Sequence, residues 1–259
     1  MTNLLRIALA ALLFAVGPGL ACAAGVIKNI VLVHGANTDG SGWRGVYDIL
    51  TKDGFHVSVV QQPLSGLTDD VAATQRVIDL QEGPVVLVGH SYGGTIITVA
   101  GADPKVKALV YVAALQPDKG ESTTKLASSM PGDVPASDLK ATKDGFIFVD
   151  PAKFPADVAA DVPKAQAQFM AHAQMPVAAA AFDAPVTVAA WHDKPSFAII
   201  ATEDRALNPK LARFMYKRSG AKVTEIRGSH LVYVSQARAV ARVIETAARA
   251  AGESTAKAQ

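Results

Sequence analysis

The sequence has 259 residues, half of them hydrophobic, and its formal net charge is +2. This length allows one sizeable α/β domain with a large covered sheet. The charge is nearly balanced and no basic run with interleaved aromatic residues occurs, which argues against a nucleic-acid partner.

The first 24 residues have the pattern of a secretory signal peptide. Arg6 supplies one positive charge, and residues 7–16 form an unbroken apolar run. This run is shorter than the roughly 20 residues that a membrane-spanning helix needs. We therefore expect residues 1–24 to be removed, leaving residues 25–259 as one exported domain, periplasmic or secreted in a bacterium, with no stable membrane span.

The end of this leader carries a small-x-small cleavage site at residues 21–23, which predicts cleavage after Ala23 or Ala24. A lipid anchor on Cys22 is the alternative, but Gly19 stands where a larger aliphatic residue is usual. Cys22 is the single cysteine of the sequence. Without it, the mature chain has no disulfide, thiolate metal site or cysteine nucleophile.

Beyond the leader, apolar strands alternate with helices along the chain. Short β-rich runs predict strands at residues 26–33, His56–Val60, 84–88, Val106–Val112, 197–201 and Lys222–Ile226. Helical spacing of apolar residues predicts helices at residues 46–53, 69–80, 92–101, 208–218 and 232–250. This alternation predicts an α/β fold, with a mostly parallel sheet flanked by helices on both faces.

One region breaks the alternation. Residues 116–195 are rich in Ala, Pro, Asp and Lys, with weak helical patterns at 156–173 and 176–181 and a strand-like run at Phe146–Val149. The region follows the strand after the serine turn described next. We expect an inserted cap over the carboxyl edge of the sheet.

The stretch Gly89-His90-Ser91-Tyr92-Gly93 has the form of a nucleophile elbow. Four apolar residues precede it and a helix-compatible run follows, which is the strand–turn–helix context that such an elbow requires. The turn exposes the serine hydroxyl and directs the N–H groups of the helix amino terminus at the reaction centre. We therefore predict Ser91 as a nucleophile.

A serine nucleophile needs a histidine base, and the histidine needs a carboxylate that holds its tautomer. His230 is the best candidate among six histidines, because it lies in a short loop after a late strand. Two carboxylates, Glu203 and Asp204, compete for the acid, since both directly follow a predicted strand. The oxyanion requires two backbone N–H groups, which we place at Tyr92 and Ala36.

No His, Asp and Glu cluster has metal-ligand spacing, and no glycine-rich phosphate loop appears. The sequence thus predicts neither a metal nor a cofactor. Aromatic and Met side chains are candidates for the pocket lining: Trp43, Tyr92, Phe154, Phe169, Met170, Phe182 and Trp191. Most of these are equally compatible with an ordinary core.

These stretches resemble the α/β-hydrolases, in particular the small cofactor-free branch that holds plant salicylate-ester esterases, hydroxynitrile lyases and many bacterial carboxylesterases. The matching segments are residues 31–36 with Gly42-Trp43, then 87–94, 108–114, 202–205 and 228–230. The elbow and the His34-Gly35-Ala36 loop are specific, whereas the cap departs from the plant members in length and composition.

The resemblance implies a triad of Ser91, Asp204 and His230, with Asp204 preferred over Glu203, and an oxyanion hole at Ala36 and Tyr92. It further implies hydrolysis of a small or medium ester through an acyl-enzyme, without a cofactor.

Two other functions stay open on the same fold. Hydroxynitrile lyases tend to carry a threonine in the first oxyanion loop and a lysine just after the catalytic histidine, where this chain has Ala36 and Leu231. Both departures favour hydrolysis. A non-catalytic protein that binds a small molecule is the other alternative.

Overall fold

The computed structural model describes residues 25–257. The predicted signal peptide, with Cys22, lies outside these residues. Within the described part of the chain, no helix is long and apolar enough to cross a membrane.

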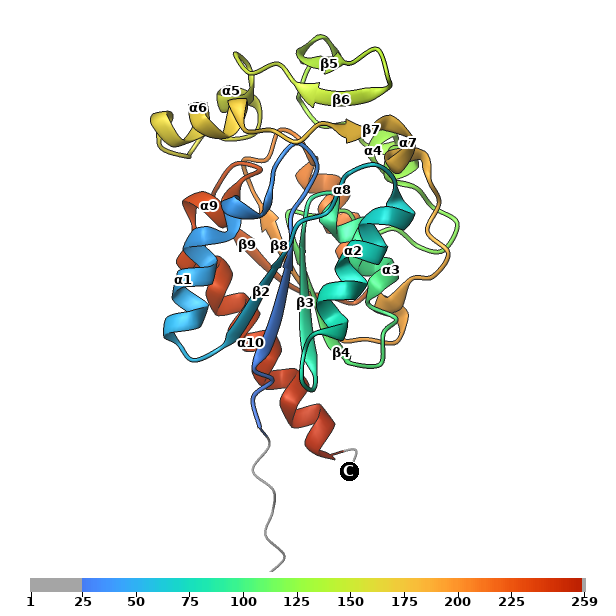
Figure 1. Ribbon diagram of the computed structural model, residues 1–259, viewed down its shortest axis with the longest axis vertical. Helices are drawn as coiled ribbons and strands as arrows, with labels where there is room; N and C mark the ends of the chain where they lie inside the picture. Colours follow the sequence, from blue (N-terminus) through green and yellow to red (C-terminus); the bar gives the residue numbers. More distant parts are fainter. Residues whose placement is uncertain (1–24, 258–259) are drawn as a thin grey trace, which may run out of the picture.

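Six strands form one central sheet, and every neighbouring pair is parallel. Their order across the sheet is β2-β1-β3-β4-β8-β9, so the strand that leads to the elbow is central. The strands are β1 (Asn29–Val33), β2 (His56–Val60), β3 (Val85–His90), β4 (Val106–Val112), β8 (Ser196–Ala201) and β9 (Lys222–Ile226). Parallel strands place their carboxyl ends at the same edge, which is the upper edge in Figure 1.

Helices cover both faces of this sheet (Figure 1), as the alternating pattern predicts. One face carries α1 (Arg44–Lys52), α9 (Val232–Ser235) and α10 (Ala237–Lys257). The other face carries α2 (Leu67–Asp79), α3 (Gly93–Ala100) and α8 (Pro209–Arg218). A short 3-10 helix, η1 (Gly40–Trp43), precedes α1. The predicted α/β fold is confirmed.

Side-chain alternation along the strands divides the core into two clusters. In β3 all six residues are buried. Val86 and Val88 join the cluster under α1 and α10, whereas Val85 and Leu87 join the cluster under α2, α3 and α8. Because successive side chains of a strand point to opposite faces, a strand covered on both sides reads as a continuous apolar run. The elbow therefore follows a strand that is buried on both faces.

Most of the chain between β4 and β8 lies over the carboxyl edge of the sheet (Figure 1), and its last residues return past α3 to the start of β8. It contains a small antiparallel sheet in the order β5-β6-β7 and several short helices. These elements are α4 (Thr123–Ser129), η2 (Ala136–Asp138), β5 (Leu139–Ala141), β6 (Phe146–Val149), α5 (Phe154–Asp157), α6 (Lys164–His172), β7 (Val177–Ala178), α7 (Ala179–Asp183) and η3 (Ala190–His192). We call this segment the cap.

Two helical predictions in the cap are wrong in detail. The stretch 156–173 is divided into α5 and α6, because Pro163 has no N–H to donate and disfavours helical backbone in the residue before it. The stretch 176–181 begins as a strand, since Val177 pairs with Ile147 of β6 and the N–H of Ala178 donates to the carbonyl of Leu64 at 2.8 Å. Tertiary pairing overrides the weak local pattern here.

The last predicted helix, 232–250, is also divided. The backbone of Gln236 leaves the helical region between α9 and α10, with φ −120° and ψ 37°. The break coincides with a contact to the cap, where the hydroxyl of Ser235 donates to the carboxylate of Asp161 at 2.7 Å.

Candidate active site

Ser91 occupies a strained turn between β3 and α3. Its φ of 52° lies in the left-handed region, which costs a non-glycine residue roughly 1–2 kcal/mol. Three backbone hydrogen bonds hold this conformation: the N–H of Ser91 donates to the carbonyl of Val112 at 3.3 Å, and its carbonyl accepts from the N–H of Gly94 at 2.9 Å and from that of Leu115 at 3.1 Å. The surrounding structure thus fixes the hydroxyl at the carboxyl edge of the sheet.

The tightness of the turn explains its glycines. A Cβ on Gly89 would lie 2.5 Å from the carbonyl oxygen of Gly93, and a Cβ on Gly93 would lie 2.7 Å from that of His34. Gly35 is equally constrained, because a Cβ there would lie 2.8 Å from the Cβ of Ser91. The elbow and the loop after β1 are therefore in direct contact.

The structure brings Ser91, His230 and Asp204 into one hydrogen-bonded row. Nε2 of His230 lies 2.9 Å from Oγ of Ser91, and Nδ1 lies 2.7 Å from Oδ2 of Asp204. A proton on Nδ1, donated to the carboxylate, leaves Nε2 free to accept the serine proton. Both His230 and Asp204 are buried, so little water competes for these bonds.

The carboxylate of Asp204 is held by the backbone that follows β8. Its Oδ1 accepts hydrogen bonds from the N–H groups of Ala206 and Leu207, each at 2.8 Å. Glu203 points elsewhere: its side chain is 50% exposed and pairs with Arg227 at 2.7 Å. Of the two carboxylates that the sequence left in competition, only Asp204 reaches the histidine.

Two further histidines are packed behind this row. Burial lowers the pKa of His34 to about 4, and burial together with the nearby His230 holds the pKa of His90 well below its usual value. Both imidazoles are therefore neutral near pH 7. Nε2 of His90 lies 3.0 Å from the carbonyl oxygen of His230, so it supports the backbone of that residue.

Ala36 and Tyr92 lie on either side of the serine, where both line the same cavity. Within residues 25–257, neither of their backbone N–H groups donates a hydrogen bond. Tyr92 is additionally fixed through its phenol, which donates to Oδ2 of Asp70 at 3.0 Å. The arrangement leaves two backbone donors available beside Ser91.

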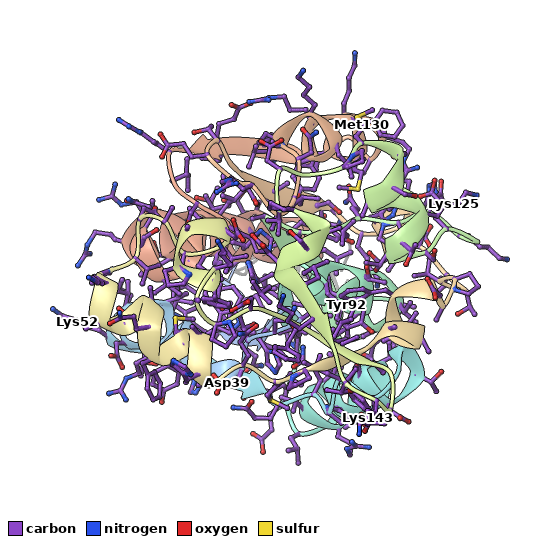
Figure 2. All side chains as sticks on the ribbon, turned by 90° about the horizontal axis from the view of Figure 1, so that it is seen from above. Asp39, Lys52, Tyr92, Lys125, Met130 and Lys143 are labelled. Atoms are coloured by element: carbon purple, nitrogen blue, oxygen red, sulfur yellow. The ribbon has the colours of Figure 1, made fainter. Side chains whose placement is uncertain are left out.

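A cavity of about 420 Å³ opens above Ser91, between the cap and the sheet. In Figure 2, which looks down on the cap, Tyr92 lies near the centre of the view beneath the cap ribbon. Of the predicted lining residues, Tyr92, Phe154 and Phe182 line this cavity. The others do not, namely Trp43, Phe169, Met170 and Trp191; Phe169 is 66% exposed, and Trp43 is core.

Comparison of the sequence with known proteins identifies the family to which the chain belongs. A sequence model of the alpha/beta hydrolase family matches residues 30–243, which is most of the chain.

The chain belongs to the alpha/beta hydrolase family.

Among curated proteins, this alpha/beta hydrolase is 38% identical over 126 residues to the carbendazim hydrolyzing esterase of Nocardioides sp. (strain SG-4G), covering 42% of this chain and 52% of that protein. The chain spans about half or less of the length of the curated relatives that it matches.

Solved structures support the same fold. A pyrethroid hydrolase from Sphingobium faniae JZ-2 superposes with a TM-score of 0.74 at 20% identity, covering 85% of this chain and 97% of the other. Polyneuridine aldehyde esterase gives a TM-score of 0.73 at 20% identity, covering 84% and 98%. At such low identity these likenesses establish the fold alone.

No group of three or more His, Cys, Asp or Glu side chains suited to a metal ion occurs among the residues that the structure describes. The chemistry available at the site is that of a hydroxyl, an imidazole, a carboxylate and backbone N–H groups.

The sequence reading missed the residues that support the site. Asp70 lies in the first turn of α2, and its carboxylate turns inward to accept hydrogen bonds from the phenol of Tyr92 at 3.0 Å and from the N–H of Leu64 at 2.7 Å. Asp161, in the cap, contacts Ser229 next to His230. Nothing in the local pattern of either aspartate indicates a partner so far along the chain.

Proposed function

We propose that this protein is a serine carboxylic-ester hydrolase that acts on small or medium esters through an acyl-enzyme. Ser91 is the nucleophile, His230 the general base and Asp204 the acid that holds the base. The single observation that carries the proposal is the continuous row of hydrogen bonds, 2.9 Å and 2.7 Å, through His230. This constellation serves acyl transfer on many folds.

In the acylation step, Ser91 Oγ attacks the ester carbonyl carbon while His230 Nε2 takes the hydroxyl proton. The carbonyl π electrons move to oxygen and form a tetrahedral oxyanion. As this collapses, the bond to the alcohol oxygen breaks, and His230 returns the proton to the departing alcohol. Deacylation repeats the sequence with water as the nucleophile and releases the acid.

The oxyanion is stabilised by the N–H groups of Ala36 and Tyr92. Both are without a partner among the described residues, and both flank the cavity beside Ser91. Donors that are fixed before the reaction stabilise the developing charge without reorganisation; removing one such donor typically costs about 10²–10³ in kcat.

The cavity favours an uncharged ester. Its described lining contains no Lys, Arg, Asp or Glu, and its cap side carries apolar residues such as Leu139, Ile147 and Val149. A charged acyl or alcohol group would lose hydration there without gaining a partner. The names of the relatives, an esterase and a pyrethroid hydrolase, agree with a small-molecule substrate.

The two alternatives are less well supported. Hydroxynitrile lyases tend to carry a threonine and a lysine at the positions of Ala36 and Leu231, and both departures favour hydrolysis. A binding protein would not need a base within 2.9 Å of the serine hydroxyl.

The test is hydrolysis of 4-nitrophenyl acetate by the mature chain and by Ser91→Ala. We expect turnover with an initial burst of 4-nitrophenol in the wild type and none above background in the variant. Turnover in Ser91→Ala at the wild-type rate would refute the mechanism, and a chain without any acylation would favour the binding protein.

We also propose that residues 1–24 are an export signal. Expression in a bacterial host, followed by amino-terminal sequencing of the periplasmic protein, should give a chain that begins at Ala24 or Gly25. A cytoplasmic chain that still begins at Met1 would contradict this.

A further inference from the structure

The cap contacts the loop of His230 on both sides of that residue. The carbonyl oxygen of Val158 accepts from the N–H of Leu231 at 3.0 Å and lies 3.2 Å from the hydroxyl of Ser229. The cap therefore holds the residue after His230 through a backbone hydrogen bond, and the same carbonyl lies close to the side chain of the residue before it.

A carboxylate of the cap also binds the loop of His230. Asp161, three residues further along the cap, accepts a hydrogen bond from the hydroxyl of Ser229 through Oδ1. Its Oδ2 accepts from the hydroxyl of Ser235, at the end of α9, at 2.7 Å. Because Ser229 is buried, bulk water cannot replace Asp161 as the hydrogen-bond partner of its hydroxyl.

The same stretch of the cap also touches the loop of the acid. Arg205, next to Asp204, lies 3.2 Å from the carboxylate of Asp157 and donates to the carbonyl of Ala156. Residues 156–161 thus bridge the loops that carry the acid and the base. Other contacts among the described residues also support the loop of His230: His90 Nε2 lies 3.0 Å from the carbonyl of His230, the exposed side chain of Arg227 pairs with Glu203, and the N–H of Glu203 donates to the carbonyl of Gly228 at 3.0 Å.

We propose that Asp161 is a positioning residue for His230. Acting through Ser229, its carboxylate fixes the loop so that Nε2 of His230 stays within 2.9 Å of Ser91 Oγ. This inference rests on the proposed function. Asp161 does not line the cavity, so it sets the geometry of the base and leaves the binding of the ester unchanged.

The geometry gives a direction and a rough size. A displacement of about 1 Å at a reacting group costs on the order of 10²-fold in rate. We expect Asp161→Ala to lower kcat about 10- to 100-fold with KM within threefold of the wild type. Asp161→Asn keeps an oxygen that accepts from Ser229 and an N–H that donates to Ser235 Oγ, so it should retain kcat within about threefold.

The experiment measures kcat and KM for 4-nitrophenyl butyrate in a double-mutant cycle of Asp161→Ala and Ser229→Ala. Ser235→Ala is the matched control, because it removes a bond to the same carboxylate but leaves the bond to Ser229. We expect the double variant to lose no more kcat than the worse single variant, and Ser235→Ala to stay within twofold of the wild type.

Thermal unfolding of each variant separates positioning from stability. A lower Tm with an unchanged kcat in both Asp161→Ala and Ser229→Ala would overturn the positioning role while leaving the esterase intact. Losses in kcat that simply multiply in the double variant would overturn it as well. A wild-type chain that hydrolyses no ester would instead contradict the proposed function, and this inference with it.

Discussion

Replacing the two neighbouring carboxylates tests the acid most sharply. Asp204→Asn and Glu203→Gln each remove one negative charge and keep the size of the side chain. In Asp204→Asn, the two backbone N–H groups of Ala206 and Leu207 require an oxygen opposite them, at the place of Oδ1. The new amide nitrogen must then face Nδ1 of His230, which in the wild type lies 2.7 Å from Oδ2 of Asp204.

Two N–H donors cannot share one hydrogen bond, so Nδ1 must give up its proton and accept. The proton moves to Nε2, which then has no lone pair for the hydroxyl of Ser91. Loss of the correct tautomer by the same Asp→Asn change costs about 10⁴ in kcat in a serine protease with this triad. We therefore expect Asp204→Asn to lose about 10³- to 10⁴-fold in kcat.

Glu203→Gln should change kcat less than twofold. Its partner Arg227 is 87% exposed, and an ion pair at such an exposed position contributes at most about 1 kcal/mol to stability. The assay is kcat for 4-nitrophenyl butyrate at pH 8, with circular dichroism to confirm folding. A larger loss in Glu203→Gln than in Asp204→Asn, or less than a tenfold loss in Asp204→Asn, would refute the assignment.

Three further changes test the cavity, the turn and the support of the elbow. Leu139→Arg places a cation at a half-exposed position of the cavity wall, and it should raise kcat/KM for the anionic 4-nitrophenyl succinate about two- to fivefold relative to kcat/KM for the neutral 4-nitrophenyl 4-oxopentanoate. The control Leu80→Arg changes an exposed position outside this cavity and should leave the ratio of the two kcat/KM values unchanged. The same ratio in both variants would contradict the uncharged lining. Gly35→Ala should abolish turnover, because the new Cβ would lie 2.8 Å from the Cβ of Ser91. An active variant would show that the loop after β1 can move to accommodate the extra methyl group. Burial raises the pKa of Asp70 to about 6, against the opposing effect of the hydrogen bonds that it accepts. Its ionisation therefore costs stability as the pH rises from about 4 to above 6, and the Tm of Asp70→Asn relative to the wild type should increase between pH 4.5 and pH 7.5; a constant difference would contradict the shift.

The elbow could be predicted from the sequence because local constraints coincide there. A six-residue strand buried on both faces, two glycines that exclude any Cβ and a helix directly after them leave few alternatives for Ser91. Chain order pointed to His230 and to the pair Glu203 and Asp204, since these positions come just past the end of a parallel strand, and the family resemblance favoured Asp204. Parallel strands bring such positions to one edge without any further information.

The cap could not be predicted in the same way. Its elements are short, and β7 has only two residues, which pair with a strand some thirty positions earlier. The contact between Asp161 and Ser229 joins residues 68 positions apart. Such contacts depend on how the cap folds onto the sheet, and hydrophobic periodicity carries no information about them.

The proposed mechanism depends on acylation of Ser91 during turnover. The most direct measurement is rapid quenching of the mature chain during the burst with a 4-nitrophenyl ester, followed by mass spectrometry of its peptides. We predict one acyl adduct, on the peptide that contains Ser91, and neither adduct nor turnover in Ser91→Ala. Steady hydrolysis without any adduct on Ser91, or an adduct on another residue that persists in Ser91→Ala, would contradict it.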